Sequence, residues 1–300
     1  MNEPIGKVLC VILHYGAEDD TNKCIQSLIH VAGLDLVIAD NDPRQSYQPP
    51  EHLRGVVQLV RTGGRAGFSE GNNIGVRAFL RDSHDSILLL NNDTIVRDGA
   101  IDYLRETLFS AGVGAVGPCM PYANAPTKIW ACGGYINKRN LAIGSVHTRL
   151  AYPYEVDYLP GAAIFCRSEI WEDIGGLNED YFLGYEEAEF ALEVKKRGFM
   201  VMVDPRSVVL HKVGMSSQLN PEYFYNMIRN KLIFSTYIYG KVAGLAYGVV
   251  VTLSSVRARS KLGRRQRIRL WARAVSDQIK GVSVDRRVLN CVARACKRVS

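Results

Sequence analysis

The sequence predicts an α/β protein with a mixed, mostly parallel sheet between helices. In the first 115 residues, short apolar runs alternate with stretches of helical spacing. Such alternation is typical of βαβ units. The run Ile87–Leu90 is apolar at every position, as expected of a strand that is covered on both faces. Each predicted strand is also followed by polar residues, which is typical of a sheet that binds a ligand at one edge.

The predicted elements follow one another in a regular order. The strands are short apolar runs, many with β-branched residues: Lys7–Leu13, Leu34–Asp40, Val56–Val60 and Ser86–Asn91. A helix is predicted after the first strand, where apolar residues recur at Cys24, Ile25, Leu28 and Ile29. A second helix is predicted over Asn72–Leu80, before the fourth strand.

Beyond about residue 115 the alternation becomes irregular. We expect four features there: a hairpin or flexible loop in Ile129–His147, two strand-like runs in Val156–Arg167 broken at Leu159-Pro160-Gly161, a short helix Ser168–Ile174 ended by Gly175-Gly176, and a helix Glu186–Arg197 ended by Gly198.

Composition places the chain among folded globular proteins, with 47% apolar and 22% charged residues. The net charge of +7 is unevenly distributed. Residues 256–300 hold 14 Lys and Arg against two Asp, a balance of +12, which leaves −5 for the rest. A mildly acidic body argues against binding of nucleic acid.

The seven cysteines form no C-x-x-C pair, and several lie in apolar runs. This pattern predicts reduced cysteines that pack in the core of a cytoplasmic protein. The first apolar stretch has the length of a strand and ends at His14, so it does not resemble a secretory signal. We therefore expect a cytoplasmic catalytic domain.

Polar residues follow all four predicted strands. They are His14-Tyr15, Asp40-Asn41-Asp42, Arg61–Arg65 and Asn91-Asn92-Asp93. Turn chemistry explains Asp and Asn at any one such place. Their recurrence favours a shared ligand crevice at the carboxyl edge of a parallel sheet.

The segment Arg65–Gly75 is rich in glycine and opens the second helix. It lacks the spacing of a dinucleotide fingerprint and does not follow the first strand, which excludes a nicotinamide cofactor. Its glycines permit close approach of the backbone to a ligand, and Asn72 and Asn73 offer amide donors and acceptors.

Asp93 is the candidate metal ligand, since it ends a buried strand in the motif Leu-Leu-Leu-Asn-Asn-Asp-Thr. One or two carboxylates suffice for Mg²⁺ or Mn²⁺ when phosphate oxygens supply other ligands. The motif predicts an ion that bridges Asp93 to a diphosphate.

Taken together, the motifs resemble the inverting family-2 glycosyltransferases of the GT-A fold, especially their bacterial rhamnosyltransferase-like branch. The matching segments run from residue 7 to about 235: Val11–Tyr15, Ile38–Asn41, Gly67–Gly75, Leu90–Thr94, Pro160–Ala163, Gly175–Glu179 and Val209–His211. The resemblance implies that Asp40 and Asn41 contact the nucleotide base or ribose. It also implies that Asn91, Asn92 and Asp93 stand in for the family's D-x-D motif.

The resemblance further implies roles for residues in the second half. Glu187 aligns with the family's catalytic base, usually Asp, and has one more methylene; Glu186 is its alternative. Acids in the first turn of a helix also interact favourably with its dipole, and this interaction is enough to explain the presence of Glu189. His211 aligns with a second metal or diphosphate ligand. Tyr158, Pro160 and Gly161 fall in the loop that lines the donor-sugar or acceptor pocket, beside the substrate contacts expected of His14, Tyr15, Gly67 and Phe68.

The expected activity is transfer of a sugar from a nucleotide-diphosphate sugar to a glycan or lipid-linked acceptor in cell-surface polysaccharide synthesis. The branch resemblance suggests rhamnose. A sugar-phosphate nucleotidyltransferase is one alternative, but the Gly-rich, Lys-bearing loop that it needs is absent after the first strand. A catalytically inactive nucleotide-sugar-binding homologue is another. A hydrolase using Glu186, Glu187 and Asp180 is disfavoured, since glycosidases need no nucleotide crevice.

The last third predicts a helical, basic region at 221–300 after a catalytic domain at 1–220. Leu232–Leu253 is long enough to cross a bilayer, but Lys241 lies near its centre. A single span would also place the +12 tail opposite a cytoplasmic domain. Interfacial docking on anionic lipid fits both facts. Packing of these helices on the core or on a dimer partner remains the other alternative.

Overall fold

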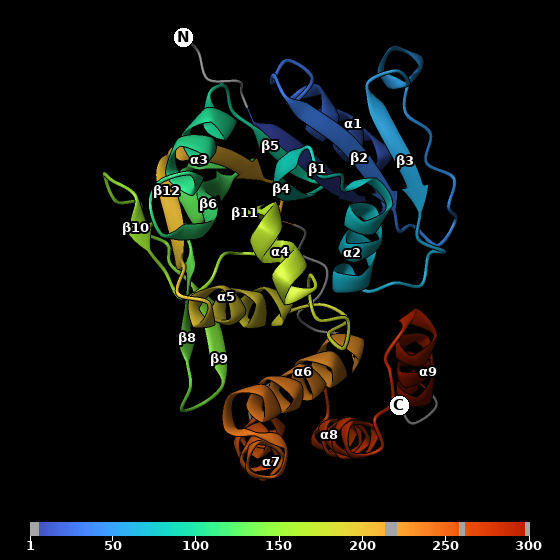
Figure 1. The fold of residues 1–300 in the computed structure, drawn as a ribbon. Coiled ribbons are helices and arrows are strands. Elements are labelled where there is room, and N and C mark those ends of the chain that lie inside the picture. Colours follow the sequence, from blue (N-terminus) through green and yellow to red (C-terminus); the bar gives the residue numbers. More distant parts are fainter. Residues whose placement is uncertain (1–5, 214–220, 258–261, 298–300) are drawn as a thin grey trace.

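A mixed sheet forms the centre of the molecule (Figure 1). The computed structural model describes residues 6–213, 221–257 and 262–297 of the chain. The strands are β1 (Lys7–His14), β2 (Leu34–Asp40), β3 (Val57–Arg61), β4 (His84–Asn91), β5 (Thr94–Val96), β6 (Val113–Tyr122), β7 (Ala125–Ala131), β8 (Gly134–Asn137), β9 (Ala142–Ser145), β10 (Tyr154–Glu155), β11 (Ala163–Arg167) and β12 (Met200–His211).

Helices connect and cover these strands. They are α1 (Glu18–Gln26), α2 (Phe68–Phe79), α3 (Ala100–Leu108), α4 (Ser168–Ile174), α5 (Glu186–Lys196), α6 (Pro221–Tyr239), α7 (Lys241–Arg257), α8 (Arg264–Ile279) and α9 (Arg286–Lys297), with a single 3-10 turn η1 (Glu51–Leu53).

The strand order in the main sheet is β10-β12-β6-β11-β4-β1-β2-β3. Strands β3, β2, β1 and β4 run parallel, as do β12 and β6, while β11 lies antiparallel between β4 and β6. The register brings the strand ends together, since His14 pairs with Asp40, Asp40 with Arg61, and Leu13 with Asn91. The predicted mixed, mostly parallel α/β sheet is confirmed.

Side chains of β1 alternate between two apolar cores because successive residues of a strand point to opposite faces. Val8, Cys10 and Ile12 pack in the core that includes residues of α1 and α3. Leu9 and Val11 pack in the core that includes residues of α2, α4 and α5. Both faces of the sheet are thereby covered, which explains the uninterrupted apolar run Ile87–Leu90 within β4.

The predicted helices are present, with shifted ends. Helix α2 starts at Phe68, four residues before the expected start, because Phe68 is the only large apolar residue of its first turn and the apolar period begins later. The hairpin expected in Ile129–His147 is formed by β8 and β9. The first run expected in Val156–Arg167 forms only a bridge between Gly134 and Tyr158, whereas the second is β11.

The four C-terminal helices lie together beside α5, away from the sheet (Figure 1). Helix α6 packs against α7, α8 and α9 around a third apolar core that includes Tyr225, Leu232 and Leu270. The stretch Leu232–Leu253 is not one helix, because the chain breaks at Gly240, where φ is +82°. No helix in the described parts of the chain is long and apolar enough to cross a membrane. The expected boundary at residue 220 lies outside the described residues.

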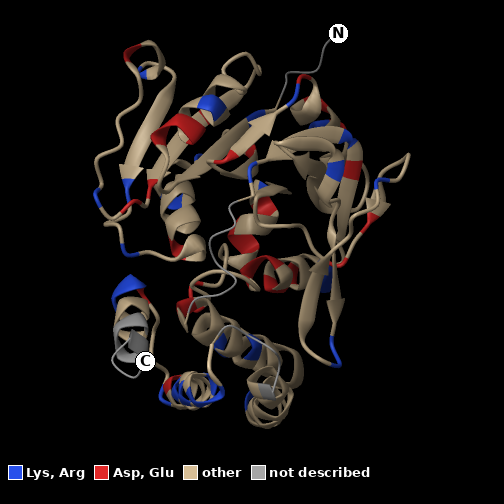
Figure 2. Cartoon of the chain, turned by 180° about the vertical axis from the view of Figure 1, so that it is seen from behind, with Lys and Arg blue, Asp and Glu red and all other residues tan. Residues whose placement is uncertain are grey.

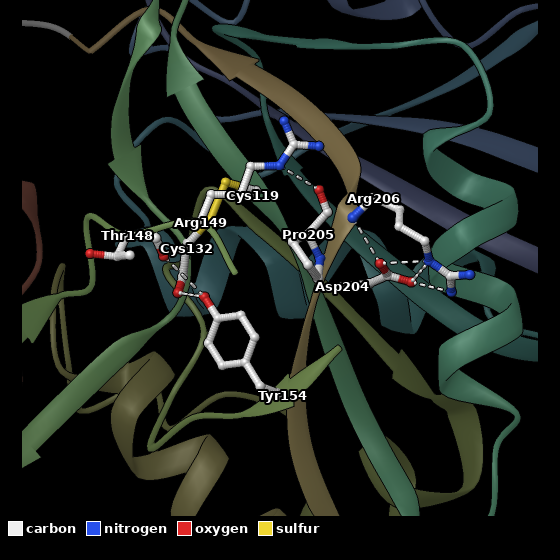
Figure 3. Close-up of a disulfide and its surroundings, with 8 residues drawn as sticks. All are labelled: Cys119, Cys132, Thr148, Arg149, Tyr154, Asp204, Pro205 and Arg206. Carbon is white, nitrogen blue, oxygen red and sulfur yellow. Dashed lines mark hydrogen bonds and ion pairs between the residues drawn. A yellow bond between two sulfur atoms is a disulfide. The ribbon is translucent and has the colours of Figure 1, made fainter. Parts of the chain in front are cut away.

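The expectation that all cysteines are reduced is wrong. Cys119 on β6 and Cys132, just after β7, form a buried disulfide (Figure 3). The two cysteines are 13 residues apart in the sequence, too far for a C-x-x-C motif. The antiparallel pairing of β6 with β7 sets Met120 opposite Ala131 and so brings the two sulfurs together. Cys10, Cys24 and Cys166 are free and buried, as predicted.

Candidate active site

A cleft with a volume of about 430 Å³ opens at the carboxyl ends of the parallel strands. Most of the residues that line it follow β1, β2, β3 or β4, and the remainder come from the loop before α5 and from α9. They are Leu13, Tyr15, Asn41, Ala66, Gly67, Phe68, Asn91, Asn92, Asp93, Phe182, Leu183 and Arg286. Three of the four predicted polar strand ends contribute residues to this cleft, whereas none of the residues 61–65 lines it.

Asp93 and His211 meet at the edge of this cleft. Asp93 immediately precedes β5, and β5 pairs with the end of β12 so that His211 lies opposite Thr94. The Nε2 atom of His211 lies 3.1 Å from Oδ1 of Asp93. The angle between them does not make a hydrogen bond, and Asp93 Oδ1 and His211 Nδ1 are buried without a hydrogen-bond partner.

A carboxylate oxygen and an imidazole nitrogen this close together could both reach one divalent cation of the Mg²⁺ or Mn²⁺ type. Trp130 packs edge-on against His211 at 4.3 Å between ring centroids and helps to hold the imidazole. Within the described residues, no group of three or more His, Cys, Asp or Glu side chains could hold a metal. An ion at Asp93 and His211 would depend on substrate oxygens for its other ligands.

His14 and Asn92 shape the cleft floor through internal bonds. His14 is 1% exposed, shares a 2.6 Å hydrogen bond with Thr21, and stacks on Tyr47. Asn92 donates to the Thr21 hydroxyl at 2.9 Å and to the carbonyl of Tyr15 at 3.2 Å. His14 therefore lies beneath the cleft and does not line it. Burial lowers its pKa and favours the neutral ring.

Asp40 and Asn41 differ in their access to the cleft. Asp40 is fully buried and its carboxylate is used by Arg61 at 2.6 Å and by the amide of Asp42 at 3.1 Å. Asn41 lines the cleft, while its amide bonds the carbonyl of Ala66 and its oxygen accepts from Thr62. The structure thus gives Asp40 a supporting position and Asn41 a position on the wall.

The glycine-rich segment packs against the loop before α5. The amide of Phe68 donates to the carbonyl of Phe182 at 2.6 Å, and a side chain at Gly67 would overlap the Phe182 backbone. The Phe68 ring in turn lies against Gly161, so Pro160 and Gly161 come close to the cleft without lining it. This close approach is the physical requirement for glycine at position 67.

Asn72 and Asn73 are buried on α2 and do not line the cleft. Asn73 donates to the Leu177 carbonyl and to Glu179, and accepts from the Leu177 amide. Asn72 donates to the Phe68 carbonyl, and its oxygen has no partner in the described structure. Asn73 thus fastens α2 to the segment after α4, whereas the Asn72 bond lies within α2.

Glu186 and Glu187 begin α5, just after Tyr185, whose φ of +79° produces the sharp turn into the helix. One carboxylate oxygen of each, Oε2, is buried without a hydrogen-bond partner. Burial raises the pKa of Glu187 to about 7. Burial, with the nearby charge of Glu187, raises the pKa of Glu186 well above its ordinary value. Two carboxyl groups with raised pKa values fit proton transfer near neutral pH.

The third acid of this helix start has a structural position. Glu189 accepts hydrogen bonds from Tyr181 at 2.6 Å and from Asn178 at 2.8 Å, so both of its oxygens are used. Tyr158 lies near enough to Glu187 that the carboxylate, after burial, raises the pKa of its phenol. Tyr158 and Glu187 therefore lie near each other.

The profile of the family described as "Glycosyltransferase like family 2" matches residues 41–232, well over half of the chain. The chain belongs to glycosyltransferase family 2.

Relatives and solved structures agree with this assignment. The chain is 26% identical over 199 residues to the low-salt glycan biosynthesis hexosyltransferase Agl10 of Haloferax volcanii, covering 64% of this chain and 62% of that one. It is 21% identical over 212 residues to the dTDP-rhamnosyl transferase RfbF of Shigella flexneri, covering 70% of each. The mannosyltransferase PcManGT of Pyrobaculum calidifontis, solved with GDP-Man and Mn²⁺, superposes with a TM-score of 0.53 at 13% identity, over 91% of this chain and 87% of that one. The fold is GT-A.

Three cleft residues of this family-2 chain escaped the sequence analysis. Phe182 and Leu183 lie in a loop that the motif Gly175–Glu179 approaches but does not include. Arg286 comes from α9, far along the chain from the other lining residues. The sequence shows Arg286 only as one of many basic residues in the tail, and no local pattern distinguishes it.

Proposed function

We propose that this chain transfers a sugar from a nucleotide-diphosphate sugar to a glycan or lipid-linked acceptor, with inversion and with a divalent metal, in the synthesis of cell-surface polysaccharide. The observation that carries the proposal is the meeting of Asp93 and His211 at 3.1 Å beside the cleft at the strand ends. Two relatives named as a hexosyltransferase and a dTDP-rhamnosyl transferase support it, the second favouring rhamnose. A solved neighbour that holds GDP-Man and Mn²⁺ supports a metal-bound donor.

Asp93 and His211 would hold the divalent ion, and Tyr15, Asn41, Asn91 and Asn92 would surround the nucleotide. When bound, the ion supplies a Lewis acid that offsets negative charge on the departing diphosphate. Asn92 and Asn41 are locked by internal hydrogen bonds, so the cleft wall is organised before substrate arrives. Such preorganisation lowers the ordering cost of binding.

Glu187 would act as the base, with Glu186 as its neighbour and alternative. The acceptor hydroxyl gives its proton to the Glu187 carboxylate as its oxygen bonds to the anomeric carbon. The bond from that carbon to the diphosphate breaks, and its electron pair leaves with the phosphate oxygen. One in-line displacement of this kind inverts the anomeric centre. A pKa of about 7 keeps a useful fraction of Glu187 ionised at neutral pH while making it a stronger base than an ordinary Glu.

The C-terminal helices would contact the cytoplasmic face of a membrane and so bring the enzyme to a lipid-linked acceptor. Exposed side chains of α8 combine Arg264, Arg265 and Arg269 with Ile268, and Val242 of α7 is 84% exposed. Figure 2 shows basic residues on α8 and at the start of α9, away from the acidic α5. Basic and apolar side chains on one region favour an anionic lipid surface. Flotation with anionic vesicles tests this, and failure to float would contradict it.

The decisive experiment is a thermal-shift panel of nucleotide sugars with and without Mn²⁺. We expect one donor class to raise the melting temperature only when the metal is present. Asp93→Asn and His211→Gln should each abolish the metal-dependent part of that shift. Asp180→Asn is the matched control, because this carboxylate is exposed and lies outside the proposed metal site. Stabilisation that is unchanged in both site variants would overturn the metal assignment.

A further inference from the structure

Arg286 reaches the donor cleft from the C-terminal helices. It is the first residue of α9, and its Nη1 atom donates to the Tyr15 hydroxyl at 2.5 Å. Its guanidinium lies over the Tyr15 ring, 4.4 Å from the centroid, and 5.9 Å from the centroid of Phe182. Two aromatic rings of the cleft wall thus hold this cation by cation–π contact.

The charge of Arg286 is not neutralised within the described structure. It is the only Lys or Arg among the described residues that line the cleft, and no described carboxylate forms an ion pair with it. Its Nε–H is buried and has no hydrogen-bond partner. Three other cations near the strand ends are paired: Arg44 with Asp42, Arg61 with Asp40 and Lys212 with Asp20. Arg65 is exposed and does not line the cleft. Arg286 therefore retains free donors beside the cleft.

The position of Arg286 is set by buried contacts of the C-terminal helices. Arg229 of α6, which is 3% exposed, donates to the carbonyl of Asp180 and to that of Val282, just before α9. The amide of Arg286 itself donates to the carbonyl of Arg65, at the start of the glycine-rich segment. The cleft loop, α6 and the start of α9 are thereby joined through hydrogen bonds.

We propose that Arg286 is a donor-binding residue that contacts the diphosphate of the nucleotide sugar. This inference rests on the proposed function, because it assumes a diphosphate donor in the cleft. Guanidinium presents several donors in a planar fork that matches phosphate oxygens, and it stays charged at all relevant pH values. The lone pairs of the diphosphate would accept from the free Nε–H and Nη–H groups while the aromatic rings keep the guanidinium oriented. The basic tail thus supplies a part of the donor site.

The test compares three classes of ligand on the wild type and three variants of the full-length protein. Binding of UDP, GDP and dTDP, of the matching nucleosides, and of inorganic pyrophosphate is measured by calorimetry with Mn²⁺. Arg286→Gln should weaken nucleoside diphosphate and pyrophosphate by about tenfold to a hundredfold, the usual effect of losing a hydrogen bond between charged groups. It should leave nucleoside binding within about twofold, since the base and ribose do not meet Arg286.

Arg287→Gln is the control, because the neighbouring Arg287 is exposed and pairs with Asp285. Arg286→Lys should recover part of the affinity, since it restores charge without the planar fork. Equal binding of diphosphates by wild type and Arg286→Gln, or an equal loss for nucleosides, overturns the inference while leaving the proposed function intact. A wild-type protein that binds pyrophosphate through Arg286 but binds no nucleotide supports the inference and overturns the proposed function. Absence of binding of every probe to wild type overturns both.

Discussion

The two walls of the cleft are built in different ways. The strand-end wall, from Tyr15, Asn41 and Asn92, is held by short bonds among its own turns, and most of its polar groups are satisfied. The opposite wall comprises Phe182, Leu183 and Arg286, and the loop that holds the first two leads directly into α5. There Glu186 and Glu187 retain oxygens without partners, and the backbone is held from outside by α6.

The two walls differ in how far their buried polar groups are satisfied. Satisfied polar groups give a rigid surface that a substrate meets without reorganisation. Buried groups without partners raise the free energy of the folded protein, and they persist where a substrate or ion completes them. Asp93 Oδ1, His211 Nδ1, Glu186 Oε2 and Glu187 Oε2 are all of this kind.

The largest effect should come from Glu187. Replacement by Gln removes the proposed base while keeping the side-chain shape, so turnover should fall by about 10²- to 10⁴-fold. Donor binding should remain, because the proposed donor contacts on the strand-end wall and at Arg286 are unchanged in this variant. Glu187→Asp is the control, since it keeps the carboxylate and should retain more activity than Gln. If Glu187→Gln turned over at the wild-type rate, Glu187 would not be the base.

The dependence of the free energy of unfolding on pH should report the raised pKa of Glu187. The pKa of Glu187 is raised to about 7 in the folded protein, above the ordinary 4.5, so the folded state binds more protons than the unfolded state between these values. The free energy of unfolding should therefore fall as pH rises through this window, by up to about 1.4 kcal/mol for each pH unit. Turnover should rise over the same range as the base ionises.

Glu187→Gln provides the control for that measurement. Chemical denaturation at several pH values should show a shallower fall in the variant, because Gln does not titrate. Glu186, whose pKa is also raised, would account for the slope that remains. Identical slopes in wild type and variant would show that Glu187 titrates normally.

The smallest effect on kcat is expected from Asn230→Ala, which is compared with Asn73→Ala. Asn230 of α6 donates to the carbonyls of Leu183 and Gly184, just before the start of α5, whereas Asn73 fastens α2 to Leu177 and Glu179. Both Asn→Ala variants should lower the free energy of unfolding by about 1–3 kcal/mol, because each leaves buried groups without partners. Only Asn230→Ala should also lower kcat, measured well below both melting temperatures. An equal loss of kcat in both variants would show a general effect of instability.

The sequence by itself determined the first four strands, the helices α1, α2, α4 and α5 and the strand-end residues, because each depends on local spacing. Apolar period and strand-end polar residues indicated β1 to β4, and the family motifs indicated Asp93, His211 and Glu187 before any contact was known. The same local logic misplaced the start of α2 and missed the disulfide, since the partner of Cys119 is chosen by the pairing of β6 with β7.

Only the tertiary structure decided which polar residues face the cleft and which support it. His14, Asp40, Asn72 and Asn73 carry the same side-chain chemistry as ligands, yet they lie under the wall with their hydrogen bonds directed inward. Arg286 carries the same charge as its exposed neighbours, yet packing of α6 against α9 brings it to Tyr15. The physical reason is that burial and long-range contacts arise from packing between elements that are distant in the sequence. The residues of one segment therefore do not show which other segment will cover them.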